Sequence, residues 1–342
     1  MTRLVLLGGG HAHALVLLKF RNFISKNLGV VLVSEGPTHT YSGMVPGVVA
    51  GHYAAADAQI DLARLAREAG AEFVRGRVLR LDPGAKQVEL ADGKLLSYDV
   101  ASLNLGSTPG DPAPHAVPAK PFEAFFASWR VLLEQGPPTP RIAVAGAGAG
   151  GVELAMSMKY ALDRRGTGGS VRIFSDRMAF LPGVAARVRA ALDARSISLH
   201  LNSGIPSGFD ATFWVTGAAA PRLLRESGLH TDSRGFVLVD PSLRSDSHPD
   251  VFAAGDNASF EGAMLPKSGV YAVRQGAVLA ENLKRIVRGL PMLDYVPQRE
   301  SLSLISCGAK YAIASRGGLS AEGRWAWRWK DWLDRRWVAR FR

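Results

Sequence analysis

The sequence predicts an α/β fold built from two doubly wound, three-layer domains. Two stretches carry the same order of apolar strand, glycine loop and apolar helix: LVLLGGGHAHALVLL at residues 4–18 and RIAVAGAGAGGVELA at residues 141–155. This order opens a βαβ unit. The chain of 342 residues is also longer than one core usually supports. The duplication therefore indicates two Rossmann-like dinucleotide-binding domains.

Composition excludes several other classes of protein. Hydrophobic residues make up 47% and charged residues 21% of the chain, as in globular proteins. No apolar run approaches the roughly 20 residues that span a bilayer. Cys307 is the single cysteine, which excludes a disulfide scaffold, a CxxC pair and a thiolate zinc site. We therefore expect a cytoplasmic protein without a metal site.

The expected elements follow the two repeats along the chain. We predict strands at residues 3–7, 30–33, 236–239 and 251–254, a helix that follows the first glycine loop and ends near residue 20, helices at 122–134 and 269–288, and a meander with turns at 82–84 and 92–93. Prolines between residues 108 and 140 mark a crossing between domains. We assign residues 1–110 and 226–300 to the first domain, 111–225 to the second, and 301–342 to an interface or membrane-association segment.

The first glycine loop has the residues that a dinucleotide requires. Gly8 permits a tight turn, and Gly10 lets the backbone approach a pyrophosphate at the helix N-terminus. The third position of the GxGxxG pattern is His13, a departure. Glu35 ends the next strand, where a carboxylate can hold a ribose hydroxyl. We expect His11 and His13 to pack against or bond to the phosphates, since the loop lacks further metal ligands nearby.

The second glycine loop matches the GxGxxG pattern in full, with Gly146, Gly148 and Gly151. The ribose-facing position is open between two interpretations. Asp176 favours NADH, whereas Ser175 with Arg177 tolerates the 2′-phosphate of NADPH. We favour NADH.

Further stretches resemble a known family. YDVASLNLGSTP, VFAAGDNA and ATFWVTGAAAP resemble segments of the FAD-dependent pyridine-nucleotide oxidoreductases, over residues 1–300. HTYSGMVPGVVAGHY, PKSGVYAVRQG and WKDWLDRRW are similar to the branch of type II NADH:quinone dehydrogenases and sulfide:quinone reductases. They resemble most the flavoprotein module fused to selenophosphate synthetase. The resemblance implies a discontinuous FAD domain, an NAD(P)H domain and a C-terminal amphipathic helix.

The same resemblance assigns roles to residues. Gly8, Gly10 and Glu35 would hold the pyrophosphate and adenosine ribose of FAD, Gly106 would pack by the flavin, and Asp256 would bind its ribityl chain. The second loop would hold NADH, with Glu153 near the nicotinamide. The other residues expected at the cofactors are His11, Ala12, Pro46, Val78, Gly255 and Gly269. Residues 199–212 leave little room for the usual meander of the NAD domain, and the catalytic cysteines of disulfide reductases are absent.

Hydride transfer to a flavin needs alignment and a positive group for the reduced form, with no acid or base beyond the flavin. Lys267, with the amides of residues 268–270, offers that group, and the alternative is a solvated surface lysine. Lys120 either reaches the flavin or begins a helix, and we favour the second interpretation. Tyr41, Met44 and Pro46 line the flavin or pack on the core.

The tail places five of the seven tryptophans between residues 325 and 337, among basic residues that give residues 324–342 a net charge of +5. On a helical wheel Trp325, Trp329, Trp332, Leu333 and Trp337 span about 140° of arc. Lys330 and three arginines lie off that face. This composition is typical of a helix in a lipid interface. The alternatives are a helix packed on the enzyme or on a second subunit, as in a homodimer, and, third, binding of nucleic acid, which we do not expect.

We therefore expect a peripheral enzyme on the inner face of the cell membrane that passes electrons from NADH through FAD to a quinone. The alternatives are a reductase of a soluble acceptor, which the resemblance to the fused module links to selenium metabolism, and a non-catalytic flavoprotein switch.

Overall fold

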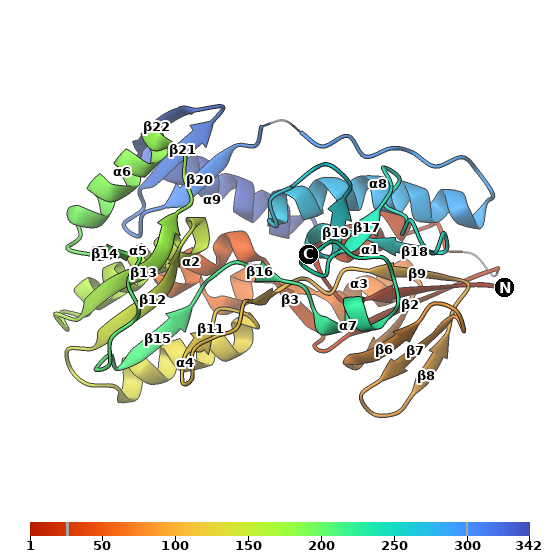
Figure 1. Cartoon of the computed structure of the whole chain (residues 1–342), viewed down its shortest axis with the longest axis horizontal. Coiled ribbons are helices and arrows are strands. Elements are labelled where there is room, and N and C mark those ends of the chain that lie inside the picture. The colour runs from red at the N-terminus through yellow and green to blue at the C-terminus, as the bar shows by residue number, and fades with distance from the viewer. Residues whose placement is uncertain (25–26, 299) are drawn as a thin grey trace.

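The computed structural model describes residues 1–24, 27–298 and 300–342. Two sheets of five parallel strands form its two halves (Figure 1). The first has the order β18-β9-β1-β2-β5, with β1 at Thr2–Leu7, β2 at Leu28–Ser34, β5 at Glu72–Arg75, β9 at Val100–Leu103 and β18 at Val251–Ala253. The second has the order β11-β15-β12-β13-β14, with β11 at Val117–Pro118, β12 at Arg141–Ala147, β13 at Ser170–Met178, β14 at Ser198–Leu201 and β15 at Ala211–Trp214.

Helices cover both sheets, as the duplicated pattern predicts. The first sheet is covered by α1 (His11–Phe20), α3 (Leu62–Ala69) and α8 (Gly269–Val287), and the second by α4 (Phe122–Gln135), α5 (Ala149–Arg164) and α6 (Pro182–Asp193). Helices α1 and α8 touch closely, because a Cβ on Gly276 would lie only 2.8 Å from Cα of Ala12. The two five-stranded sheets with their helices confirm the predicted α/β class. The domain boundaries stay a prediction.

Shorter elements lie outside the two five-stranded sheets. They are the meander β6 (Val78–Asp82), β7 (Gln87–Leu90) and β8 (Leu95–Ser97), the pairs β3 (Thr38–Thr40) with β4 (Gln59–Asp61), β10 (Thr108–Pro109) with β16 (Ala218–Ala219), and β17 (Val237–Val239) with β19 (Ala258–Phe260), the helices α2 (Val45–Val49) and α7 (Arg222–Glu226), and the 3₁₀ turns η1 (Ser42–Met44), η2 (Ala55–Ala58) and η3 (Gly255–Asn257). The second sheet has no such meander, since residues 202–210 join β14 to β15 without a strand.

The C-terminal segment begins with an antiparallel sheet of β20 (Ser303–Ser306), β21 (Ala312–Arg316) and β22 (Leu319–Gly323), followed by α9 (Arg324–Ala339). Ala326, near the start of α9, packs on Ala312 and Ala314 of β21. At the other end, Trp337 and Phe341 join the core of the first half. Helix α9 therefore connects the two halves of the molecule (Figure 1).

The face of α9 differs from the sequence prediction. Trp325, Trp329 and Trp332 are exposed, with relative exposures of 50%, 41% and 53%, but Trp337 is buried at 8%. Lys330, which was predicted to lie off the apolar face, is largely buried, and its Nζ donates hydrogen bonds to the Gly43 carbonyl and to Asp334. The helical wheel could not separate the two faces, because both carry apolar residues. In the described part of the chain, no helix combines the length and apolarity needed to cross a membrane.

Candidate functional site

A cavity of about 2100 Å³ lies between the two halves and is reached by both glycine loops. Ordinary pockets for one small ligand measure roughly 300–1,000 Å³, so this cavity has room for more than one. The predicted residues that line it are Gly8, Gly10, His11, Glu35, Pro46, Val78, Gly106, Gly146, Gly148, Glu153, Asp176, Asp256, Lys267 and Gly269. The fold therefore brings the two groups of predicted residues to one space.

Three predicted residues do not line the cavity and lie behind its wall. The amide of Ala12 donates to Oδ1 of Asn104 at 3.1 Å and is occupied by the protein itself. A Cβ on Gly151 would lie 2.0 Å from the Gly146 carbonyl oxygen, so Gly151 allows α5 to pack closely on the loop. The amide of Gly255 donates to Oε1 of Gln275 at 2.6 Å. These residues shape the wall without facing the cavity.

Asn104, which follows β9, holds the first glycine loop in place and was not predicted. Its backbone oxygen accepts a hydrogen bond from the Gly10 amide at 3.2 Å, and its Nδ2 donates to the Ala254 carbonyl at 2.8 Å. Gly8 has φ of +93°, and a Cβ there would lie 2.5 Å from the Asn104 oxygen. The loop thus needs glycine at this position for both its turn and its close contact.

His11 and His13, which lie in the first turn of α1, have different environments. His13 is fully buried, with Nδ1 at 2.6 Å from the Gly8 oxygen and Nε2 at 2.8 Å from Oγ of Ser102. Because a carbonyl can only accept, Nδ1 of His13 carries the proton. Burial lowers the pKa of His13 to about 4. His13 is therefore part of the core, and the prediction that it faces a phosphate was wrong.

His11 faces the cavity. Its Nδ1 lies 3.1 Å from Nε2 of His39, while its own Nε2 is buried and finds no hydrogen-bond partner among the described residues. Burial, and to a lesser degree the charge of Lys120, lower the pKa of His11 to about 4. His11 is therefore a neutral imidazole in the cavity wall, with one buried ring nitrogen that has no partner among the described residues.

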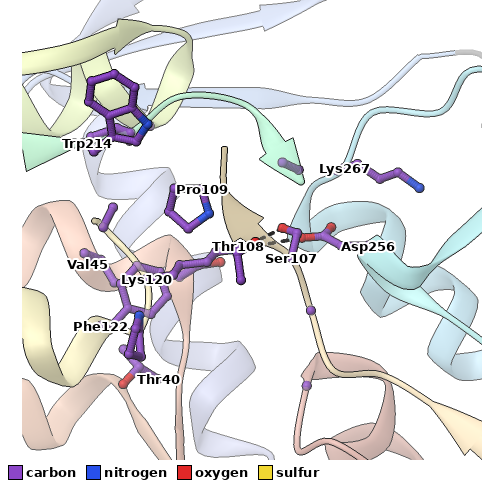
Figure 2. Close-up of a pocket in the computed structure, with 18 of the residues that line it drawn as sticks. Thr40, Val45, Ser107, Thr108, Pro109, Lys120, Phe122, Trp214, Asp256 and Lys267 are labelled. Atoms are coloured by element: carbon purple, nitrogen blue, oxygen red, sulfur yellow. Dashed lines mark hydrogen bonds and ion pairs between the residues drawn. The ribbon is translucent and has the colours of Figure 1, made fainter. Parts of the chain in front are cut away.

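Asp256 lies at the centre of a small polar cluster in the wall. Ser107 donates its hydroxyl to Oδ2 of Asp256 at 2.6 Å, and Nζ of Lys120 lies 3.4 Å from the same oxygen (Figure 2). Lys120 lines the cavity. It precedes α4, which begins at Phe122, and so does not begin the helix as favoured from sequence. Neither Ser107 nor Lys120 carries a spacing signal that would have revealed this contact.

Lys267 lines the cavity, but its ammonium group contacts other parts of the wall than Asp256. Its Nζ donates to the Ala258 carbonyl at 2.5 Å and lies 3.9 Å from the centre of the Phe236 ring. Figure 2 shows the side chain pointing away from Asp256. Burial is the main cause that lowers the pKa of Lys267 to about 8. The position of Lys267 is therefore that of a cation packed on the wall.

Glu153 stands on α5 just after the second glycine loop and is contacted by the C-terminal segment. Its Oε1 accepts a hydrogen bond from the Ser306 amide at 2.8 Å. Burial raises the pKa of Glu153 to about 6, against the lowering effect of the Lys330 charge. A carboxylic acid with a pKa near neutrality, placed in a cavity wall, can hold or release a proton.

The residues present fit two dinucleotides. A Cβ built on Gly106 or on Gly148 meets nothing within 4 Å, so both glycines leave open space at the cavity. Nε2 of His11, in the wall of the same cavity, has no hydrogen-bond partner among the described residues. At the second loop, Asp176 and Arg177 are both exposed and line the cavity at the end of β13.

Comparison with known proteins agrees with this geometry. Residues 2–276 match the family model described as pyridine nucleotide-disulphide oxidoreductase. The NADH dehydrogenase-like protein YutJ of Bacillus subtilis is 24% identical over 87% of this chain and 87% of its own length. The type II NADH:quinone oxidoreductase of Staphylococcus haemolyticus is 22% identical over 86% of this chain and 84% of its own.

Solved structures share the fold. The sulfide:quinone oxidoreductase of Aquifex aeolicus superposes with a TM-score of 0.83 at 18% identity, covering 100% of this chain and 92% of that one. The water-forming NADH oxidase of Lactobacillus brevis, bound to NADH, gives a TM-score of 0.73 at 22% identity, covering 93% and 75%. With its two glycine loops on one cavity, the chain belongs to the pyridine nucleotide-disulphide oxidoreductase family and is an oxidoreductase that uses FAD and NAD(P)H.

Proposed function

We propose that this enzyme passes electrons from NADH through FAD to a quinone at a membrane surface, on the inner face of the cell membrane. The observation that carries the proposal is the outer face of α9. Trp325, Trp329 and Trp332 are exposed there, while the opposite face of the helix is buried in the enzyme. The quinone-reducing relatives support the choice of acceptor.

The outer face of α9 has the chemistry of a lipid interface. The indole rings of Trp325 and Trp329 are stacked with centroids 6.4 Å apart, and the guanidinium of Arg336 lies 5.1 Å from the centre of the Trp332 ring. Tryptophan prefers the level of the lipid headgroups, and arginine attracts anionic lipid. A quinone is dissolved in the adjoining hydrocarbon layer, so this face would bring the enzyme to its acceptor.

The chemistry requires no sulfur from the protein. When bound, FAD accepts hydride from NADH and supplies electrons to an acceptor, which is chemistry of the cofactor. Cys307, the single cysteine, is fully buried, and burial raises the pKa of its thiol to about 12. The residues of the cavity would align the two ring systems and exclude water.

The electron path is tested with the purified protein under anaerobic conditions. NADH should bleach the yellow flavin, and a quinone should restore the colour. Bleaching that a quinone fails to reverse would rule out the quinone as acceptor, while the enzyme would remain an NAD(P)H oxidoreductase.

The membrane surface is tested with the variant Trp325→Ala/Trp329→Ala/Trp332→Ala. Co-sedimentation with vesicles containing an anionic phospholipid should fall at least tenfold, and salt should weaken binding of the unchanged protein. The matched control is Trp129→Phe, at a core tryptophan on α4. Unchanged vesicle binding, or a shift from dimer to monomer instead, would show that this face serves another purpose. Deleting residues 323–342 is a poorer test, since Trp337 and Phe341 belong to the core.

A further inference from the structure

The cavity wall contains an ion pair whose partners come from distant parts of the chain. Lys120 lies on the crossing between β11 and α4, and Asp256 lies in η3, after β18. Their closest atoms, Nζ and Oδ2, are 3.4 Å apart. Ser107 bonds to both, because its hydroxyl donates to Asp256 and its oxygen accepts from Lys120 at 3.3 Å. The crossing therefore brings a positive charge to the first half of the cavity.

Asp256 depends on this cation. Its side chain is only 12% exposed, so the carboxylate has lost most of its contact with water. A carboxylate in that position needs a counter-charge to offset its lost solvation. Among the described residues, Lys120 is the cation within ion-pair distance of Asp256. Lys267 makes no ion pair with Asp256, because its Nζ bonds to the Ala258 carbonyl and lies over Phe236, although the Asp256 charge acts on it from a greater distance.

The positive field of Lys120 extends across the same wall. The Lys120 charge contributes to the lowered pKa of both His11 and His39, although burial is the larger cause for each. His11 opens α1, directly after the first glycine loop, and lines the cavity. The ammonium group thus acts on the surface that faces the FAD half of the cavity.

We propose that Lys120 is a positioning residue for FAD, which acts through Asp256. The ammonium group of Lys120 offsets the negative charge of Asp256 near the flavin. It thereby stabilises the anionic reduced form relative to the oxidised form. Charge close to the ring is one of the means by which a protein tunes a flavin. The proposal depends on FAD binding and holds whichever acceptor the enzyme uses.

The test is the reduction potential of the bound flavin, measured by spectroelectrochemistry on FAD-loaded protein. Lys120→Met should make the reduced form about tenfold less favoured, a drop of about 30 mV for a two-electron couple. Lys120→Arg should keep the equilibrium constant for flavin reduction within threefold of the original value. Lys94→Met, at an exposed lysine outside the cavity, is the matched control. A larger drop in Lys267→Met than in Lys120→Met would overturn the proposal.

The double variant Lys120→Met/Asp256→Asn separates charge from structure. Removing both charges should reverse most of the fall in the reduction potential of the flavin. A purely structural role for Lys120 predicts instead a fall at least as great as in the single variant. If Lys120→Met fails to retain FAD, the affinity for added FAD is compared instead, and the double variant should bind more tightly than the single one. An unchanged potential in Lys120→Met, or no recovery in the double variant, would refute the proposal.

Discussion

Nζ of Lys330 lies 2.9 Å from Oδ2 of Asp334, one turn apart on α9, and both side chains are buried against the loop that lines the cavity. The same ammonium group donates to the Gly43 carbonyl at 2.7 Å and is one of the charges that act on Glu153. A buried cation thus fastens the C-terminal helix to the wall of the cofactor site.

Removing one partner of this pair should destabilise the protein. Asp334→Asn leaves Lys330 with less counter-charge, and loss of one partner of a buried pair costs about 3 kcal/mol. Urea unfolding followed by circular dichroism measures the change. Arg335→Ala, which breaks the partly exposed pair with Asp331, serves as the comparison and should cost under about 1 kcal/mol. Equal losses in the two variants would show that the Lys330 pair is no stronger than a surface contact.

Glu153 should make stability depend on pH. Its pKa is raised from 4.5 to about 6, so the native state holds this proton more tightly than the unfolded chain. The resulting contribution is complete below pH 4.5 and is lost as the pH rises through 6, a change of about 2 kcal/mol. Relative to Glu153→Gln, the original protein should lose this amount between pH 4.5 and 7.5 in urea unfolding. A constant difference between the two proteins over that range would contradict the assignment.

The glycines of the second loop should respond differently to an added methyl group. The methyl group added by Gly148→Ala meets open space in the protein, so the free energy of unfolding should change by less than about 0.5 kcal/mol. The methyl group would occupy the approach of the pyrophosphate, and NADH affinity should fall at least tenfold in fluorescence titration. Gly151→Ala, which would clash with Gly146, should instead destabilise the fold by about 1–3 kcal/mol. Retained NADH affinity in Gly148→Ala would place the nucleotide elsewhere.

Asp176 should set the preference for NADH over NADPH. Its carboxylate lies at the end of β13, where it can accept from the ribose 2′-hydroxyl and repel a 2′-phosphate. Asp176→Ser should reduce the ratio of kcat/KM for NADH to that for NADPH at least tenfold, while Glu134→Gln, outside the cavity, should leave the ratio alone. If the unmodified protein prefers NADPH, Arg177 and not Asp176 sets the coenzyme preference.

Local patterns sufficed for most of the scaffold. The glycines between an apolar strand and a helix predicted both βαβ openings, and the start of α8 at Gly269 agrees with the sequence. These signals are local because strand, turn and helix formation depend on neighbouring residues. The short segment between β14 and β15 was also predicted, from its length alone.

Contacts between distant segments could not be predicted in the same way. Lys120 follows the short strand β11 and Lys267 follows an irregular segment, and only the three-dimensional crossing of the chain determines which ammonium group meets Asp256. Likewise, the rotation of α9 about its axis depends on what it packs against. Trp337 is buried because the core of the first half accepts it, although its spacing from Trp332 suits one apolar stripe.

Helix α9 also has a mechanical consequence. Ala326 is seated on β21 beside the second half, and Phe341, at the far end, is wedged into the hydrophobic interior of the first. Rotating one half against the other would have to unseat one of these anchors. We therefore expect α9 to resist rotation of the two halves and to hold the two nucleotide loops at a fixed separation.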